Sequence, residues 1–424
     1  MKPPEPRNYW LDTVRFPAGS GGSLPAKVDV AVVGAGFTGL SAALQLARKG
    51  ANVAVLEARS IAWGASSRNG GMVLTGTKLP FDILQRRYGR ELTRRMYQSS
   101  LDAIDFVGKC VREESIDCDF VRCGHLEVAS KPAHFDGYRR SADLLQKEFD
   151  HEITLIDGKD LGAEIGSDIY YGGLVDPLSA GINPARFASG VANSALNAGA
   201  LIYEDARVLG IEGRKLRTTR GDVTAKEIVI ATGAYTSAAT PPLHRRVVPV
   251  GSFIVATERL PESLARQLSP RGRMIFDSMH YLHYFRLTPD RRILFGGRAA
   301  FFPENENTLR RSATILARDL VRTFPQLAQT AIEYAWGGTL DFCFDSMPHV
   351  GTIDGLHYAA GFAGHGVAMA SWLGAQIAWQ ISGCEPDSPF RQIPCPGAPL
   401  GLYNGVPWFL PFAGAWYKIL DWIS

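Results

Sequence analysis

The chain has 424 residues, of which 46% are hydrophobic, and its formal net charge at pH 7 is +3. This length allows a large buried core, and we expect two closely joined domains. The small net charge and the lack of a long basic run give no reason to expect binding to nucleic acid.

The sequence predicts a cytoplasmic protein without a membrane-spanning segment. Residues 1–10 are polar and rich in proline, unlike a secretory signal. No apolar run reaches the roughly 18–20 residues of a membrane-spanning helix. The six cysteines include no CxxC pair and no zinc-type spacing, so we expect reduced thiols.

The first predicted elements carry the strongest pattern in the chain. An apolar run at 28–33 leads into the glycine turn GAGFTG at 34–39, and a helix-like segment rich in Ala and Leu follows. A second apolar run at 53–56 ends on the carboxylate of Glu57. This order is that of the strand–turn–helix–strand unit that binds dinucleotides.

The glycines and the acidic residue of this unit each have a physical role. Gly34 permits the tight turn, Gly36 lets a pyrophosphate approach the backbone, and Gly39 lets helix and strand pack closely. The helix N-terminus then presents free N–H groups to the phosphates. Glu57 is placed to accept hydrogen bonds from a ribose. We therefore expect the chain to bind a dinucleotide.

Two further segments favour FAD over NAD, and the position of the glycine turn near the start of the chain agrees with them. Segment 63–72, WGASSRNGGM, offers small residues and polar donors to a pyrophosphate and to a flavin edge. Segment 227–233, EIVIATG, is an apolar strand that ends in Ala-Thr-Gly. Many flavoproteins bring the chain back beside the adenosine half of FAD with such a strand.

The regions between these segments have a different character. Residues 81–114 carry apolar side chains at helical spacing with charges between them, which predicts one or two amphipathic surface helices. Residues 126–129 and 253–257 predict strands of a separate sheet, joined by 281–287 and 292–297. We expect this sheet to cover the cofactor and to form the substrate pocket.

The C-terminal tail, residues 395–424, is rich in aromatic and apolar residues, and from Trp408 onward only Lys418 and Asp421 are charged. One interpretation is that the tail packs over the protein's own surface or in a subunit contact. The other is a helix on a membrane surface, although the basic face expected of such a helix is missing.

Taken together, these segments resemble the D-amino-acid oxidase and glycine/sarcosine oxidase group of FAD-dependent amine oxidoreductases, and most of all its γ-glutamylputrescine oxidase branch. The resemblance covers nearly the whole chain. It rests on Tyr9-Trp10, GAGFTGLSAA at 34–43, GASSRNGGM at 64–72, 181–184 with Gly199-Ala200, 230–233, YFRLTPDRRILFGG at 284–297, AWGG at 335–338 and GFAGHG at 361–366.

The resemblance implies an α/β fold, in which a Rossmann-like FAD-binding domain of the two-dinucleotide-fold type is interleaved with an antiparallel-sheet substrate domain. We expect residues 28–80, 176–240 and 337–394 in the FAD-binding domain, 81–175 and 241–336 in the substrate domain, and 395–424 as the tail. The expected cofactor contacts are Gly34, Gly36, Phe37, Thr38, Gly39, Glu57, Ala58, Arg59, Gly64, Ala65, Ser66, Ser67, Arg68, Asn69, Gly70, Gly71, Met72, Val208, Ala231, Thr232, Gly233, Gly361, Phe362, Gly364, Gly366 and Val367.

In this class hydride leaves a carbon next to nitrogen, and negative charge grows at the N1/C2 oxygen end of the flavin. Residues 361–366 precede an apolar helix at 367–381, whose N-terminus could stabilise that charge. His365 is either an added positive charge or a neutral cap. We expect it in the catalytic site.

Aromatic residues at 280–285 and Trp336 predict a pocket for an alkylamine or polyamine chain. Alternate residues of a strand face opposite sides. We favour the set with Tyr284 and Arg286 as facing the flavin, over the set with His283. Arg286 could hold a distal carboxylate or favour superoxide during reoxidation.

Comparison within the family narrows the substrate. Sarcosine-type oxidases place a Lys shortly after GHG to hold a carboxylate, whereas this chain has Val367-Ala368-Met369. Arg286 and Arg298 are other candidates for that role. Cys343 falls several residues too late to match the flavin-linking cysteine, so we expect non-covalent FAD.

We therefore expect oxidation of a small primary or secondary amine to an imine and aldehyde, with O2 as acceptor and hydrogen peroxide as product. The alternatives are an amino-acid oxidase or dehydrogenase of the same fold and a flavin-binding subunit without turnover. If the tail binds a membrane, a quinone could replace O2.

Overall fold

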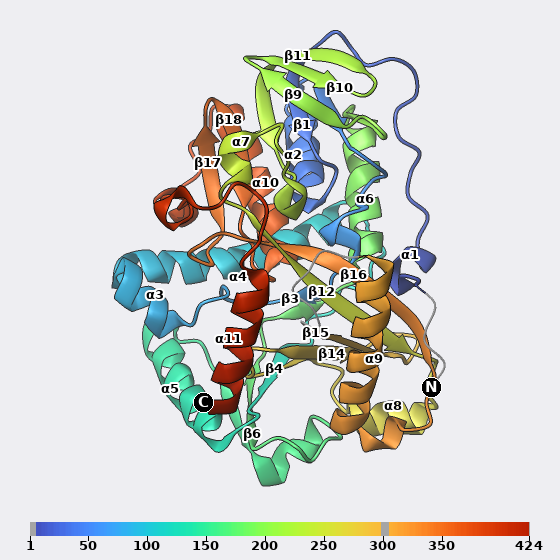
Figure 1. Cartoon of the computed structure of the whole chain (residues 1–424), viewed down its shortest axis with the longest axis vertical. Helices are drawn as coiled ribbons and strands as arrows, with labels where there is room; N and C mark the ends of the chain where they lie inside the picture. The colour runs from blue at the N-terminus through green and yellow to red at the C-terminus, as the bar shows by residue number, and fades with distance from the viewer. Residues whose placement is uncertain (1–5, 298–304, 424) are drawn as a thin grey trace.

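The computed structural model describes residues 6–297 and 305–423, and it contains two eight-stranded sheets. In Figure 1 the sheet that holds β1 and β11 lies in the upper part of the molecule, and the sheet that holds β12, β14 and β15 lies below it. This is the mixed α/β, two-domain arrangement that the sequence predicts. Arg298, one candidate cation, lies outside the described residues.

The first sheet is a nucleotide-binding sheet whose central strands are parallel. Its order is β17 (His349–Ile353), β18 (Leu356–Ala360), β11 (Gly221–Ile230), β1 (Lys27–Val33), β2 (Val53–Leu56) and β8 (Leu201–Tyr203). In addition, β10 (Lys215–Thr218) pairs with β11, and β9 (Val208–Glu212) pairs with β10. The predicted strands at 28–33 and 53–56 are β1 and β2, which pair in parallel. The predicted returning strand is the end of β11, and β11 pairs in parallel with β1.

Three helices pack together beside this sheet: α2 (Phe37–Arg48), α6 (Pro184–Asn197) and α10 (Gly366–Ile381). Helix α2 contacts both α6 and α10. The predicted helix after the glycine turn is α2, and the predicted apolar helix near the end is α10. They approach closely because Gly374 has no side chain, and a Cβ there would collide with the carbonyl oxygen of Thr38. Ser41 Oγ also donates a hydrogen bond to the Ser371 carbonyl, 2.7 Å away.

The segment at 81–114 forms two amphipathic helices, as its pattern predicts. It forms α3 (Phe81–Tyr88) and α4 (Arg90–Glu113). Met96, Ile104 and Val107 of α4 are fully buried in a core that also contains residues of α2 and α10. The prediction of amphipathic helices is therefore confirmed, and α10 contacts α4.

The second sheet has the order β16 (Ile332–Phe342), β12 (Val248–Thr257), β15 (Ile293–Gly297), β14 (His283–Leu287), β13 (Met274–Asp277), β4 (His125–Val128), β6 (Gly172–Asp176) and β5 (Thr154–Asp157). Its pairs are antiparallel except for β13 with β4, which is parallel. β16 runs through residue 337, the expected domain boundary. β3 (Met72–Val73) and β7 (Ala180–Gly181) form a separate pair.

The two faces of this second sheet differ in chemistry. One face carries Phe253, Phe285 and Phe295 into a core shared with α9 (Glu306–Thr323). The opposite face carries Tyr284 toward the loop at 64–72, where its ring lies against Gly70. The remaining helices are α1 (Tyr9–Asp12), α5 (Pro132–Phe149), α7 (Pro241–His244), α8 (Glu262–Leu268) and α11 (Leu410–Ile423).

The tail folds back as α11, which runs along the lower half of the molecule in Figure 1. The Asp421 carboxylate accepts hydrogen bonds from the backbone N–H groups of His280 and Tyr281, at 2.7 and 2.8 Å. The tail therefore packs on the chain's own surface. Its outer side leaves Trp408, Phe412, Trp416, Ile419 and Trp422 exposed. None of the helices among the described residues is long and apolar enough to cross a membrane.

Candidate functional site

A cavity of about 400 Å³ lies between the glycine turn, the end of β2, the end of β11 and the start of α10. Nineteen of the predicted cofactor contacts line it: Gly34, Gly36, Phe37, Thr38, Glu57, Ala58, Arg59, Gly64, Ala65, Ser66, Asn69, Val208, Ala231, Thr232, Gly233, Phe362, Gly364, Gly366 and Val367. The structure thus brings five segments of the chain, at 34–38, 57–69, 208, 231–233 and 362–367, to one cavity.

Seven other predicted contacts do not line this cavity: Gly39, Ser67, Arg68, Gly70, Gly71, Met72 and Gly361. The sequence reasoning also missed several residues that do line it, including Arg207, Tyr235 and Asp341. Tyr235 follows the Ala-Thr-Gly end of the returning strand, so its position two residues after Gly233 was the available signal.

The glycine turn has the geometry that a dinucleotide needs. Gly34 has φ +104°, and a Cβ there would lie 2.7 Å from the Ala231 carbonyl oxygen. A Cβ on Gly39 would collide with the Gly34 carbonyl oxygen. A Cβ on Gly36 would lie 2.9 Å from Ser66 Oγ, on the cavity wall. Side chains at Gly34 and Gly39 would collide with neighbouring backbone, and a side chain at Gly36 would lie on the cavity wall, which supports the predicted role of the turn.

Glu57 stands at the end of β2 on the cavity wall. Its Oε2 accepts a hydrogen bond from the Ala35 N–H at 2.8 Å, and its Oε1 accepts one from the Arg59 N–H at 2.9 Å. Burial raises the pKa of the carboxyl, the nearby charge of Glu204 adds to this, and the backbone hydrogen bonds oppose it. Since each carboxylate oxygen has more than one lone pair, Glu57 keeps the capacity to accept bonds from a ribose diol.

The loop at 64–72 is held in place by its own polar side chains and by two tryptophans. The Asn69 amide donates to the Ala65 carbonyl at 3.0 Å and accepts from the Gly71 N–H at 2.8 Å. The indole N–H of Trp10 donates to the Asn69 carbonyl at 2.8 Å. The indole N–H of Trp336 donates to the Arg68 carbonyl at 3.1 Å.

Trp336 was expected in the substrate pocket, and its placement differs. It is only 2% exposed and packs with Tyr9, Trp10 and Tyr334 in a buried cluster. The residue lies on β16, where Tyr334 and Trp336, as alternate residues, point into this cluster. Its position suits support of the loop rather than contact with a substrate.

The start of α10 forms the other end of the cavity. Its cap residue, His365, accepts no side-chain hydrogen bond from the N–H groups of the helix. Burial lowers the pKa of His365 to about 3, and electrostatic repulsion from Lys78 and His125 adds to this. Of the two interpretations of His365, the structure therefore favours the neutral one. The free N–H groups and the helix dipole remain as the source of positive potential at this end.

Asp341 connects this end of the cavity to the second sheet. Its Oδ2 accepts a hydrogen bond from the Gly361 N–H at 2.7 Å, and its backbone carbonyl accepts one from Ala363 N–H at 2.9 Å. Burial raises the pKa of the Asp341 carboxyl, and the hydrogen bonds from the backbone oppose the increase. Asp341 thus fixes the turn from which α10 begins.

Tyr284 and Arg286 share the face of β14 that looks toward the loop at 64–72, as we favoured. The Arg286 Nη1 donates there to the backbone carbonyls of Gly71 and Ile182 at 2.8 and 2.9 Å, whereas its Nε has no hydrogen-bond partner among the described residues. Burial lowers the pKa of its guanidinium. This geometry differs from the expectation that Arg286 holds a carboxylate of the substrate, and it makes Arg286 a brace for the loop.

The same face carries a polar group that the sequence reasoning missed. Leu126 and Val128 of β4 enter the core on the α9 side, so His125 and Glu127 point the other way. His125 Nε2 lies 3.4 Å from Glu127 Oε1, and His125 Nδ1 lies 2.8 Å from Ser179 Oγ. The Glu127 side chain is 31% exposed. The alternation of polar and apolar residues in HLEV was the signal that could have located this pair.

Comparison with known proteins identifies the family. The FAD dependent oxidoreductase family (DAO) matches residues 29–380. The chain belongs to this family. It is 33% identical over 399 residues to gamma-glutamylputrescine oxidoreductase of Escherichia coli (strain K12), which covers 93% of this chain and 92% of that protein.

Two solved structures show the same fold. Glycine oxidase from Geobacillus kaustophilus has a TM-score of 0.73 at 20% identity, covering 87% of this chain and 99% of that chain. L-Proline dehydrogenase from P. horikoshii has a TM-score of 0.67 at 21% identity, covering 87% and 96%. The chain is thus an FAD-dependent oxidoreductase, and the resemblance drawn from its sequence is confirmed. Its cradle at Gly34, Gly36 and Glu57 fits the cofactor of the family.

Proposed function

We propose that this oxidoreductase oxidises a small primary or secondary amine, such as a γ-glutamylputrescine-like compound or an alkylamine. The observation that carries the proposal is the charge on the sheet face above the loop at 64–72. Glu127 of β4 presents a partly exposed carboxylate on this face, in register with Tyr284 through Phe276 of β13, while the Arg286 Nη1 is engaged by two backbone carbonyls. This face therefore suits a cationic ammonium group better than a carboxylate.

Different residues of the chain would bind the cofactor and orient the substrate. The glycine turn and Glu57 would hold the pyrophosphate and a ribose of FAD, and the start of α10 would face developing negative charge. FAD, when bound, supplies the acceptor for the hydride of the C–H bond next to nitrogen. Glu127 would orient the substrate through a charge-assisted hydrogen bond to its ammonium group. Neutral His365 adds no charge that would repel this group.

The products follow from electron balance. The amine loses two electrons and two protons and becomes an imine, which water hydrolyses to an aldehyde and ammonia or a smaller amine. We propose that O2 takes up two electrons and two protons and is released as hydrogen peroxide. We also propose that FAD is held without a covalent bond, because no cysteine occurs among the described residues that line the cavity. The six unpaired thiols support a cytoplasmic location.

An amino-acid oxidase of the same fold is the second candidate, and the named relatives include both kinds of substrate. Such an enzyme must hold a carboxylate next to the reacting carbon. Arg286 is buried and bonded to backbone, which argues against its binding that carboxylate. Ala368 stands where sarcosine-type oxidases carry a carboxylate-binding Lys, so this position offers no cation either.

Peroxide release with a panel of substrates tests the proposal. We expect higher kcat/KM for γ-glutamylputrescine and an alkylamine than for glycine and sarcosine. Glu127→Gln should raise KM for the best amine by about 10- to 100-fold, which corresponds to a lost charged hydrogen bond of about 1.5–3 kcal/mol. Glu212→Gln, at an exposed position of β9, is the control. Equal KM in both variants, or a higher kcat/KM for sarcosine than for any amine, would contradict the proposal.

A further inference from the structure

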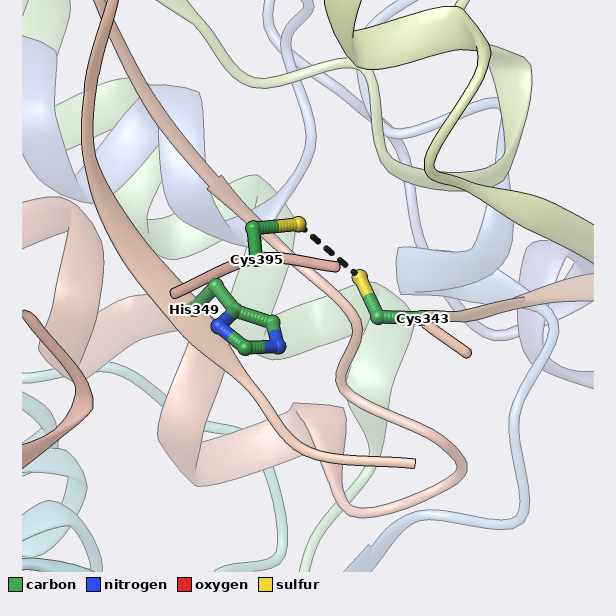
Figure 2. Close-up of side chains that lie close together, drawn as sticks. All are labelled: Cys343, His349 and Cys395. Carbon is green, nitrogen blue, oxygen red and sulfur yellow. Dashed lines mark hydrogen bonds between the residues drawn. The ribbon is translucent and has the colours of Figure 1, made fainter. Parts of the chain in front are cut away.

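Three side chains with metal-binding chemistry converge away from the FAD cavity. Cys343 follows the end of β16, His349 begins β17, and Cys395 lies in the segment after α10. The two sulfur atoms are 3.7 Å apart, and both lie within 4.8 Å of a ring nitrogen of His349. Figure 2 shows the imidazole beside both thiols. None of the three lines the FAD cavity.

We propose that Cys343, His349 and Cys395 bind a zinc ion. Thiolate sulfur and imidazole nitrogen are the ligands that Zn²⁺ prefers in proteins. Two sulfurs at about 2.3 Å from a tetrahedral zinc are about 3.8 Å apart, which the observed 3.7 Å matches. A disulfide needs sulfurs about 2.05 Å apart, so it would require a much larger movement.

Two of the three side chains are removed from solvent. Cys343 is 2% exposed and His349 is fully buried, while Cys395 is partly buried. When Zn²⁺ binds, both thiols release their protons to solvent. Two thiolates and one Zn²⁺ then sum to zero charge, which limits the cost of burial.

A carboxylate beside the histidine completes the environment. Asp345 Oδ1 lies 3.0 Å from His349 Nε2, while Nδ1 has no hydrogen-bond partner in the part of the chain that the structure describes. Metal-bound histidines are commonly oriented by such a carboxylate. A water molecule would take the fourth tetrahedral position.

The proposed zinc would link the segment after α10 to the cofactor side of the molecule. Cys343 Sγ lies 2.7 Å from the point where a Cβ on Gly361 would be, so it touches the turn that precedes α10. Cys395 stands 52 residues farther along the chain. A metal between them would fix the start of the tail against this turn. We infer a structural role, independent of which amine the enzyme oxidises.

Metal analysis of the purified holoenzyme is the direct test. We expect about one zinc per chain, its loss in the double variant Cys343→Ser/Cys395→Ser, and its retention in Cys384→Ser, which changes an exposed cysteine. Co²⁺ in place of zinc should give tetrahedral d–d bands at wavelengths beyond flavin absorption. Zinc retained by the double variant, or a wild-type protein without zinc that carries a Cys343–Cys395 disulfide by mass spectrometry, would overturn the proposal.

A second measurement uses only wild-type protein, in case the variants fail to fold. A chromophoric chelator should release zinc, and the rate at which Cys343 and Cys395 react with an alkylating reagent should then rise at least tenfold. Cys384 should react equally fast before and after chelation. Unchanged rates at Cys343 and Cys395, or release of no zinc, would show that these residues hold no metal.

Discussion

His283 offers a test of which face of β14 belongs to the core. Its Nδ1 lies 3.0 Å from Asp277 Oδ2, and its Nε2 lies 3.5 Å from Asp319 Oδ2 on α9. Burial alone would lower the pKa of His283, but the hydrogen bonds and charges of the two aspartates raise it to about 9. Because this pKa exceeds the unfolded value of about 6.5, protonation of His283 stabilises the folded state.

The size and the pH range of the effect follow from this shift. A shift of about 2.5 units corresponds to about 3 kcal/mol, which we reduce to about 2 kcal/mol since the side chain is 27% exposed. This stability is fully present below about pH 6.5 and is lost as the pH rises through about 9.

His283→Gln should therefore unfold at lower denaturant concentration than the wild type at pH 6.5, and the gap in unfolding free energy should nearly close by about pH 10. Denaturant titrations followed by tryptophan fluorescence at several pH values measure the gap, with His280→Gln as the exposed control. A gap that stays constant between pH 6 and 10 would refute the assigned ion pairs.

Four further outcomes are expected. Gly36→Val should purify largely without flavin, as measured by absorbance, because a side chain there blocks the approach of the pyrophosphate. Trp336→Phe should lower the flavin content of the purified protein and leave KM nearly unchanged, because the indole supports the loop at Arg68. A tenfold rise in KM with full flavin content would instead show contact with substrate. Gly374→Ala should cost about 1–3 kcal/mol of stability in thermal denaturation, because its Cβ would meet the backbone of α2. Removal of α11 should lower the melting temperature, and liposome sedimentation that depends on α11 would indicate a membrane partner.

The parts of the fold that sequence reasoning found are those with local causes. The turn at Gly34 needs a positive φ, and Gly39 needs room for a neighbouring carbonyl, so residue type alone reports the geometry. The same is true of β1, β2 and the start of α10, where strand, turn and helix follow one another directly. No long-range information is needed to recognise them.

The parts that it missed depend on partners distant in the chain. Arg286 looked available for a substrate because its partners are backbone carbonyls, which leave no mark on the sequence. Cys343 and Cys395 show no metal-type spacing, and only the fold brings them together. The role of Glu127 depends on which face of β4 its side chain lies on, and only the packed sheet determines that face.

Anaerobic reduction of the bound flavin tests the central claim most directly. The oxidised holoenzyme is mixed in the absence of oxygen with γ-glutamylputrescine, an alkylamine, glycine, sarcosine or proline, and the yellow absorbance is followed in time. The account predicts rapid bleaching by an amine, slow or no bleaching by the amino acids, and return of the colour with peroxide formation when air is admitted. Bleaching by an amino acid alone, or a flavin that stays oxidised with every compound, would contradict it.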